Sequence, residues 1–134
     1  LPVELYDNGP RHTVVVLDAE EQVAALAPDL AALAALDVQA ECAAGSGRRW
    51  KARNFAPTLG VPEDPATGSA AGPIAVHLAR HGAIGFGEQI EVRQGEEIGR
   101  PSLLRATAHG SAAGVRRVEV AGSAVVVAEG AYAL

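Results

Sequence analysis

Residues 61–81 read VPEDPATGSAAGPIAVHLARH, a turn-rich, acid-containing segment that runs directly into the most apolar helical stretch of the chain. The helical part, residues 73–81, carries apolar side chains on nearly every side and stops at Gly82. A helix that is apolar all round is buried, so we expect it in the middle of the domain rather than on its surface. The other elements are then expected to surround it.

A proline inside this stretch constrains where the helix begins. Pro73 has no N–H group and is tolerated only where that group would lack a helical partner, so we expect the regular helix to begin near Ser69 or Ala70. Residues 64–68 would then form a loop around the helix N-terminus, with backbone amides free to face a ligand.

The rest of the chain alternates between β-type runs and turns, with one helical interruption. Asp18 can cap a helical segment over residues 19–36, which Pro28 either kinks or divides into two short helices. The β-type runs are residues 2–7, 12–17, 38–43, 48–55, 89–93, 102–108, 114–121 and 124–129, with a final stretch to residue 133. This pattern predicts a single α+β domain over residues 1–134, in which a curled, mostly antiparallel sheet wraps around a central helix.

Composition and charge limit the possible partners. The net charge of −5 and the lack of a basic run argue against nucleic acid or an anionic membrane as a partner. The longest apolar runs are about half a membrane span, and we see no transmembrane segment or signal peptide. A single cysteine, Cys42, excludes an internal disulfide and fits a reducing compartment. We therefore expect a folded, soluble, cytoplasmic domain.

The start of the sequence is unusual. The chain contains no methionine and opens on Leu1-Pro2-Val3 as though within a strand. We interpret it as a domain excised from a longer polypeptide or processed at its start. The alternative is a short gene product that lost its initiator methionine.

Asp64 is the main candidate for chemistry. A loop carboxylate beside a helix N-terminus can move a proton on and off a bound small molecule, and desolvation by a closing partner would raise its pKa. Thr67 and Ser69 could hydrogen-bond a substrate carboxylate, and Gly68 would allow a close backbone approach. A purely structural role remains open for the same residues: Asp64 would brace the turn, and the hydroxyls would cap the helix.

The histidines and the cysteine are weaker candidates. His77 and His81 have i,i+4 spacing but lack the intervening glutamate of the metalloprotease pattern, so we expect no metal site. Cys42 lies in a β-type run rather than at a helix start beside a base. A buried structural thiol therefore fits it better than a nucleophile.

Four blocks of the sequence, in order, resemble the PhzF family of phenazine-biosynthesis-like proteins, which share the diaminopimelate epimerase fold. The blocks are Asn8-Gly9-Pro10-Arg11-His12, Arg53-Asn54-Phe55-Ala56-Pro57, the run from Gly60 to Ala70, and Gln94-Gly95 with Ile98-Gly99-Arg100-Pro101-Ser102. The resemblance implies a two-lobed isomerase that needs no cofactor or metal and acts by acid/base proton transfer on a small carboxylate-bearing metabolite in the cleft between the lobes.

On matching positions, the resemblance makes Asp64 the acid/base or orienting carboxylate. Ser69 and the amides of Gly68 and Ala70, with Thr67 nearby, would hold the substrate. Diaminopimelate epimerases place a catalytic cysteine at this helix start, and the absence of a thiol here disfavours that racemase chemistry.

All four blocks resemble the C-terminal lobe. In the family, the N-terminal lobe supplies the principal catalytic glutamate and a histidine, and no motif in this sequence replaces them. We therefore expect half of an active site, inactive alone, completed by an N-terminal lobe in cis or in trans. An exposed cleft face would favour association with that lobe or with a second copy as a homodimer. The alternative is a non-catalytic binding or assembly module that retains the fold.

Overall fold

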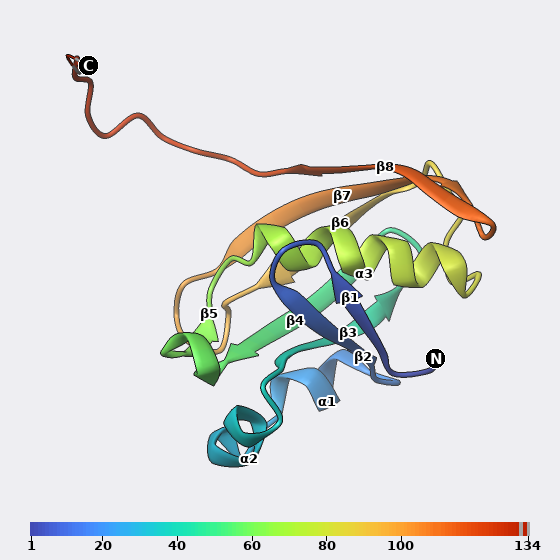
Figure 1. The fold of residues 1–134 in the computed structure, drawn as a ribbon, viewed down its shortest axis with the longest axis horizontal. Coiled ribbons are helices and arrows are strands. Elements are labelled where there is room, and N and C mark those ends of the chain that lie inside the picture. Colours follow the sequence, from blue (N-terminus) through green and yellow to red (C-terminus); the bar gives the residue numbers. More distant parts are fainter. Residues whose placement is uncertain (132, 134) are drawn as a thin grey trace.

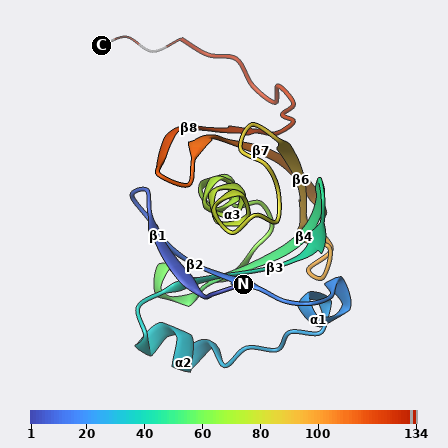
Figure 2. The same ribbon diagram turned by 90° about the vertical axis from the view of Figure 1, so that its right-hand side faces the viewer.

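The computed structural model describes residues 1–131 and residue 133, and it shows a curled sheet surrounding one long helix, α3 (Gly68–Arg80) (Figures 1 and 2). Along the sheet, neighbouring strands follow the order β1 (Glu4–Asp7), β2 (Arg11–Val16), β3 (Gln39–Ser46), β4 (Arg49–Ala56), β6 (Gln89–Gln94), β7 (Ser102–Ser111) and β8 (Gly114–Ala121). A short strand, β5 (Val61–Asp64), pairs with β4 beside a 3₁₀ turn, η1 (Pro57–Leu59). Two short helices, α1 (Glu20–Ala24) and α2 (Leu30–Ala35), lie outside the sheet (Figure 2). This arrangement confirms the predicted fold class.

The strand pairing is mostly antiparallel. β2 with β3 and β4 with β6 run parallel, because the chain between each pair crosses over, through α1 and α2 in the first case and through α3 in the second. The other pairs are antiparallel, including the predicted hairpins β1–β2 and β3–β4. With β1 and β8 at its two ends, the sheet forms an open half-barrel around α3 (Figure 2).

Side chains alternate between the two faces of the sheet and build two apolar layers. The inner layer packs strand residues such as Val14, Ala52 and Ile90 against Ile74 and Leu78 of α3. The outer layer is smaller and packs Ala40, Cys42 and Phe55 against the leucines of the α1–α2 segment. Pro28 lies between the two short helices, so of the two alternatives at this proline, a kink or a division, the structure shows the division.

The central helix is buried along almost its whole length, from Ala70 to Ala79, as its all-round apolar sequence predicts. It begins at Gly68, slightly earlier than expected, and Pro73 lies inside it. Pro73 has no N–H to give to the Ser69 carbonyl four residues earlier. The side-chain amide of Asn8, in the β1–β2 turn, donates to that carbonyl instead at 2.9 Å. A contact from another part of the chain thus offsets the missing helical bond.

Three other details differ from the sequence-based expectations. Asp18 does not cap α1, because the N-cap position is Ala19. The Gln22 side chain instead reaches back and accepts hydrogen bonds from the backbone amides of Asp18 and Ala19. Asp64 ends a short strand rather than beginning a loop. In the described part of the chain, residues 124–129 form no strand and have no pairing partner, and Val125, Val126 and Val127 are more than four-fifths exposed. Among residues 1–131 and 133, no helix has the length and apolarity needed to cross a membrane.

Candidate active-site face

The loop between β5 and α3 is held in place by one glutamine. Gln94, at the end of β6, donates from Nε2 to the Asp64 carbonyl at 2.6 Å and to Thr67 Oγ1 at 2.8 Å. Its Oε1 accepts from the Thr67 amide at 3.2 Å. Thr67 Oγ1 in turn donates to Asp64 Oδ2 at 2.8 Å. The buried Thr67 hydroxyl therefore orients the Asp64 carboxylate and is itself oriented by Gln94.

Residues at the end of β6 and the start of β7 also contact this loop. Ser102 Oγ donates to the Pro65 carbonyl at 2.7 Å. Gly95 has φ +78°, and a Cβ at this position would come within 2.8 Å of the Pro65 carbonyl oxygen and 2.3 Å of the Arg100 carbonyl oxygen. Only glycine allows this conformation together with such a close approach. The ends of β6 and β7 thus form a platform for the loop.

The first turn of α3 presents two free amides beside the carboxylate. Ala66 N–H points to Asp64 Oδ1 at 3.4 Å, and the Ala70 N–H donates to the Thr67 carbonyl at 3.1 Å. Within the described residues, the amides of Gly68 and Ser69 have no acceptor, and both residues are exposed. Free amides at a helix N-terminus attract anions because the helix dipole adds to their partial positive charge. The half-buried Asp64 and these two amides therefore form a small polar face with both an acid and an anion site.

A buried polar triad lies behind this face. His12, Glu41 and Asn54 come from neighbouring strands, share the inner face with the core, and are at most 1% exposed. His12 Nδ1 lies 2.8 Å from Glu41 Oε1, and Asn54 Nδ2 donates to the same oxygen. In the described part of the chain, His12 Nε2, Glu41 Oε2 and Asn54 Oδ1 have no hydrogen-bond partner.

The triad is linked to Asp64 through both the backbone and the electrostatic field. Asn54 is the register partner of Asp64 in the β4–β5 pairing. Burial raises the pKa of Glu41, and the charge of Asp64 raises it further, while the contacts with His12 and Asn54 work in the opposite direction. A buried acid with a raised pKa thus lies behind the half-buried Asp64 carboxylate.

Comparisons with known proteins assign the family. The model of the family described as phenazine biosynthesis-like protein, PhzC-PhzF, matches residues 1–130. The chain belongs to this family. It is 54% identical over 134 residues to trans-2,3-dihydro-3-hydroxyanthranilate isomerase of Pseudomonas chlororaphis, a match that covers 99% of this chain and 48% of the relative.

Solved structures of PhzF proteins share the fold. The PhzF-family protein of Enterococcus faecalis superposes with a TM-score of 0.56 at 30% identity, over 79% of this chain and 40% of that one. The Bacillus anthracis member gives a TM-score of 0.65 at 17% identity, over 75% and 38%, and at that identity it supports the fold alone. The chain spans about half the length of the curated relatives that it matches.

The sequence blocks that suggested the PhzF family meet in space. Asn8 contacts the helix start, Asn54 and Asp64 pair, and Gln94 and Ser102 hold the loop between them. The sequence analysis had named Asp64, Thr67, Gly68, Ser69 and Ala70. The structure places all five within one turn of the α3 N-terminus, with Thr67 and the Ala70 amide already engaged inside the chain.

The sequence analysis assigns no site role to three side chains that hold or lie behind this polar face: Glu41, Asn54 and Gln94. A signal was present for Glu41, because it is the only charge in an otherwise apolar and amide-bearing run, Val38 to Ala43, and its position in the alternation places it on the inner face. Gln94 belongs to one of the four family blocks, but its role in holding the loop follows only from its neighbours in space. Cys42 is nine-tenths buried in the outer apolar layer, and this burial raises the pKa of its thiol to about 11, which favours the structural interpretation over the nucleophile.

Proposed function

We propose that this chain supplies one wall of the active site of an isomerase, with Asp64 as its acid/base group. The observation that carries the proposal is the position of the Asp64 carboxylate beside the free amides of Gly68 and Ser69, in a loop fixed by Gln94. A substrate carboxylate would bind at the two amides and the Ser69 hydroxyl. The Asp64 carboxyl would then remove a proton from one substrate atom and return a proton to another.

This transfer conserves protons and electrons, so it needs no oxidant, reductant or organic cofactor. The relatives named as acting on trans-2,3-dihydro-3-hydroxyanthranilate support this substrate class, a small ring carboxylate, for the present chain. The buried Glu41 behind the face would tune the charge that Asp64 experiences during the transfer.

The proposal includes a second lobe. Asp64 is only half-buried, and Gly68 and Ser69 are exposed, so this face alone does not exclude water from a substrate. The matched relatives are about twice as long as the chain, and a lobe of similar size would cover the face. Exposed valines on β8 and in the segment after it, including Val120 and Val126, offer apolar surface for that lobe. We expect the 134-residue chain to be inactive alone.

A chimaera tests the assignment. This chain would replace the matching segment of the Pseudomonas chlororaphis isomerase, and turnover of trans-2,3-dihydro-3-hydroxyanthranilate would be followed by its absorbance. The chimaera should be active, and Asp64→Asn should lower kcat by about 10²-fold or more, the scale of a lost acid/base group. Ser69→Ala should raise KM more than it lowers kcat. Asp37→Asn, which changes an exposed aspartate paired with Arg11, serves as the control.

Two results would refute the proposal in different ways. An Asp64→Asn chimaera as active as its parent removes Asp64 from the chemistry. Turnover by the purified 134-residue chain shows that no second lobe is needed. An inactive but folded parent chimaera supports the alternative of a binding or assembly module that has kept the fold.

A further inference from the structure

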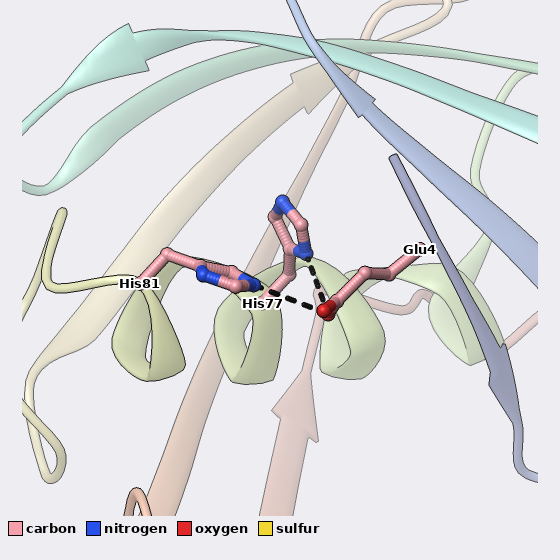
Figure 3. Close-up of side chains that lie close together, drawn as sticks. All are labelled: Glu4, His77 and His81. Atoms are coloured by element: carbon pink, nitrogen blue, oxygen red, sulfur yellow. Dashed lines mark ion pairs between the residues drawn. The ribbon is translucent and has the colours of Figure 1, made fainter. Parts of the chain in front are cut away.

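A second polar cluster lies at the opposite end of α3 from the Asp64 face. Glu4 of β1 points toward His77 and His81 at the C-terminal end of the helix, and the three side chains converge (Figure 3). Glu4 Oε2 lies 3.5 Å from His77 Nδ1 and 3.1 Å from His81 Nε2. One ligand atom from each of the three residues lies within 4.8 Å of the other two. The sequence analysis expects no metal site here, because His77 and His81 lack the intervening glutamate of the metalloprotease pattern; the third residue, Glu4, is distant in sequence.

The fold explains why these residues meet. Residues four apart lie on the same face of a helix, so the two imidazoles project side by side, with ring centroids 4.7 Å apart. β1 is the edge strand of the half-barrel and lies beside α3, which brings the Glu4 side chain next to both rings (Figures 2 and 3). Two separate elements therefore supply the cluster, and neither could form it alone.

Tyr6 of β1 contacts the same cluster through its hydroxyl. The His77 ring is fully buried, and its Nδ1 lies 3.0 Å from the Tyr6 hydroxyl as well as 3.5 Å from Glu4 Oε2. The Tyr6 hydroxyl donates to Glu4 Oε2 at 2.6 Å. His81 Nε2 is buried and lacks the alignment of a hydrogen bond with Glu4 despite their short separation.

We propose that Glu4, His77 and His81 form a binding site for a divalent transition metal ion, with zinc as the best fit. Zinc binds imidazole nitrogen and carboxylate oxygen at about 2.0–2.2 Å, so ligand atoms at the corners of a tetrahedron lie about 3.3 Å apart. The observed separations of 3.1 and 3.5 Å lie on either side of that value. Magnesium and calcium prefer all-oxygen sites, whereas two imidazoles and one carboxylate suit zinc with a fourth position open to water.

The site is independent of the proposed isomerase chemistry. α3 extends from Gly68 to Arg80, and at 1.5 Å per residue its two ends lie about 20 Å apart. A metal here would fasten the edge strand β1 to the central helix and stabilise the half-barrel. The charge of Arg80, which also acts on Glu4, opposes a bound cation, so we expect weaker binding than in a closed four-ligand site.

Calorimetric titration of the purified chain with zinc chloride tests the site. We expect one zinc per chain, a zinc-dependent rise in Tm, and the visible absorption of tetrahedral coordination when cobalt replaces zinc. His81→Ala and Glu4→Gln should each weaken zinc binding at least about tenfold, since removing even an outer partner of a metal has effects of that size. Both positions are partly exposed, so these variants should fold, which circular dichroism would check.

His109→Ala is the matched control, because His109 pairs with Glu119 at 2.7 Å and, among the described residues, no third candidate ligand joins them. It should keep the zinc affinity of the wild type. The proposal is overturned if the wild-type chain binds no zinc at one per chain, or if either folded ligand variant binds zinc as tightly as the wild type. In those cases the cluster is only an ion-pair link between β1 and α3.

Discussion

Removing the carboxylate of the buried triad should destabilise the protein strongly. In Glu41→Ala, His12 Nδ1 and Asn54 Nδ2 both lose their shared acceptor, and all three residues are at most 1% exposed. A buried polar group left without a partner costs about 1–3 kcal/mol, so the two together should cost about 2–6 kcal/mol of the free energy of unfolding. Domains of this size are commonly stable by about 5–15 kcal/mol, so the loss should be large.

The matched variant is Glu41→Gln, which keeps the size of the side chain and one acceptor oxygen. It should cost clearly less than Glu41→Ala, about 2 kcal/mol at most, because one buried donor can still be paired. Urea unfolding followed by fluorescence is a direct assay, since Trp50 is the only tryptophan and is 4% exposed. A Glu41→Ala variant within about 0.5 kcal/mol of wild type would refute this account of the triad.

The comparison of the wild type with Glu41→Gln also predicts how the free energy of unfolding depends on pH. Burial raises the pKa of Glu41 in the folded state above its ordinary value of 4.5, so between the two values the folded state binds more protons than the unfolded state. The contribution of Glu41 to stability is therefore fully present below about pH 4.5 and falls as pH rises through the folded pKa. Relative to Glu41→Gln, the wild type should lose stability with rising pH across this window. A relative gain would show that the folded pKa is lowered instead.

Two further stability predictions concern contacts between distant segments. Asn8→Ala should cost about 0.5–1.5 kcal/mol in the wild type and less than half of that in a Pro73→Ala background, where the new amide reaches the Ser69 carbonyl. Equal costs in a double-mutant cycle by urea unfolding would contradict this. Arg53→Met should cost about 3–5 kcal/mol in thermal unfolding, because it removes a bidentate pair with Glu63 and the donor to carbonyl groups at the end of α1 and just beyond it. The exposed Arg117→Met, as a control, should stay within about 0.5 kcal/mol of wild type.

Much of the secondary structure follows from local sequence patterns. Turn residues at 7–10 and 45–47 delimit the first two hairpins, Pro28 divides the outer helices, and the all-round apolar stretch ends at Gly82 as expected. These features depend on residues two to four positions apart, so a single short segment carries all the information that they need. Residues 124–129 show the limit of such patterns. A valine-rich run becomes a strand only when another strand supplies hydrogen-bond partners, and in the described structure this run has none.

The candidate site was only partly predictable, for the same reason. Asp64 and Ser69 could be named because a turn, an acid and a helix start are adjacent in sequence. The roles of Gln94 and Glu41 depend on which strand lies next to which and in what register. A shift of one residue in β3 would turn Glu41 from the inner face to the outer one.

The sequence by itself predicted a curled sheet around one buried helix, which the structure confirms, and it named the segment beginning at Asp64 as the candidate site. Only the tertiary structure decided what surrounds that segment and what lies at the other end of the helix. Gln94 fixes the loop, Glu41 lies behind it, and Glu4 joins His77 at the far end. The physical reason is that backbone pattern is set by near neighbours in the chain, whereas sites are made by side chains that strand register and helix packing bring together from distant positions.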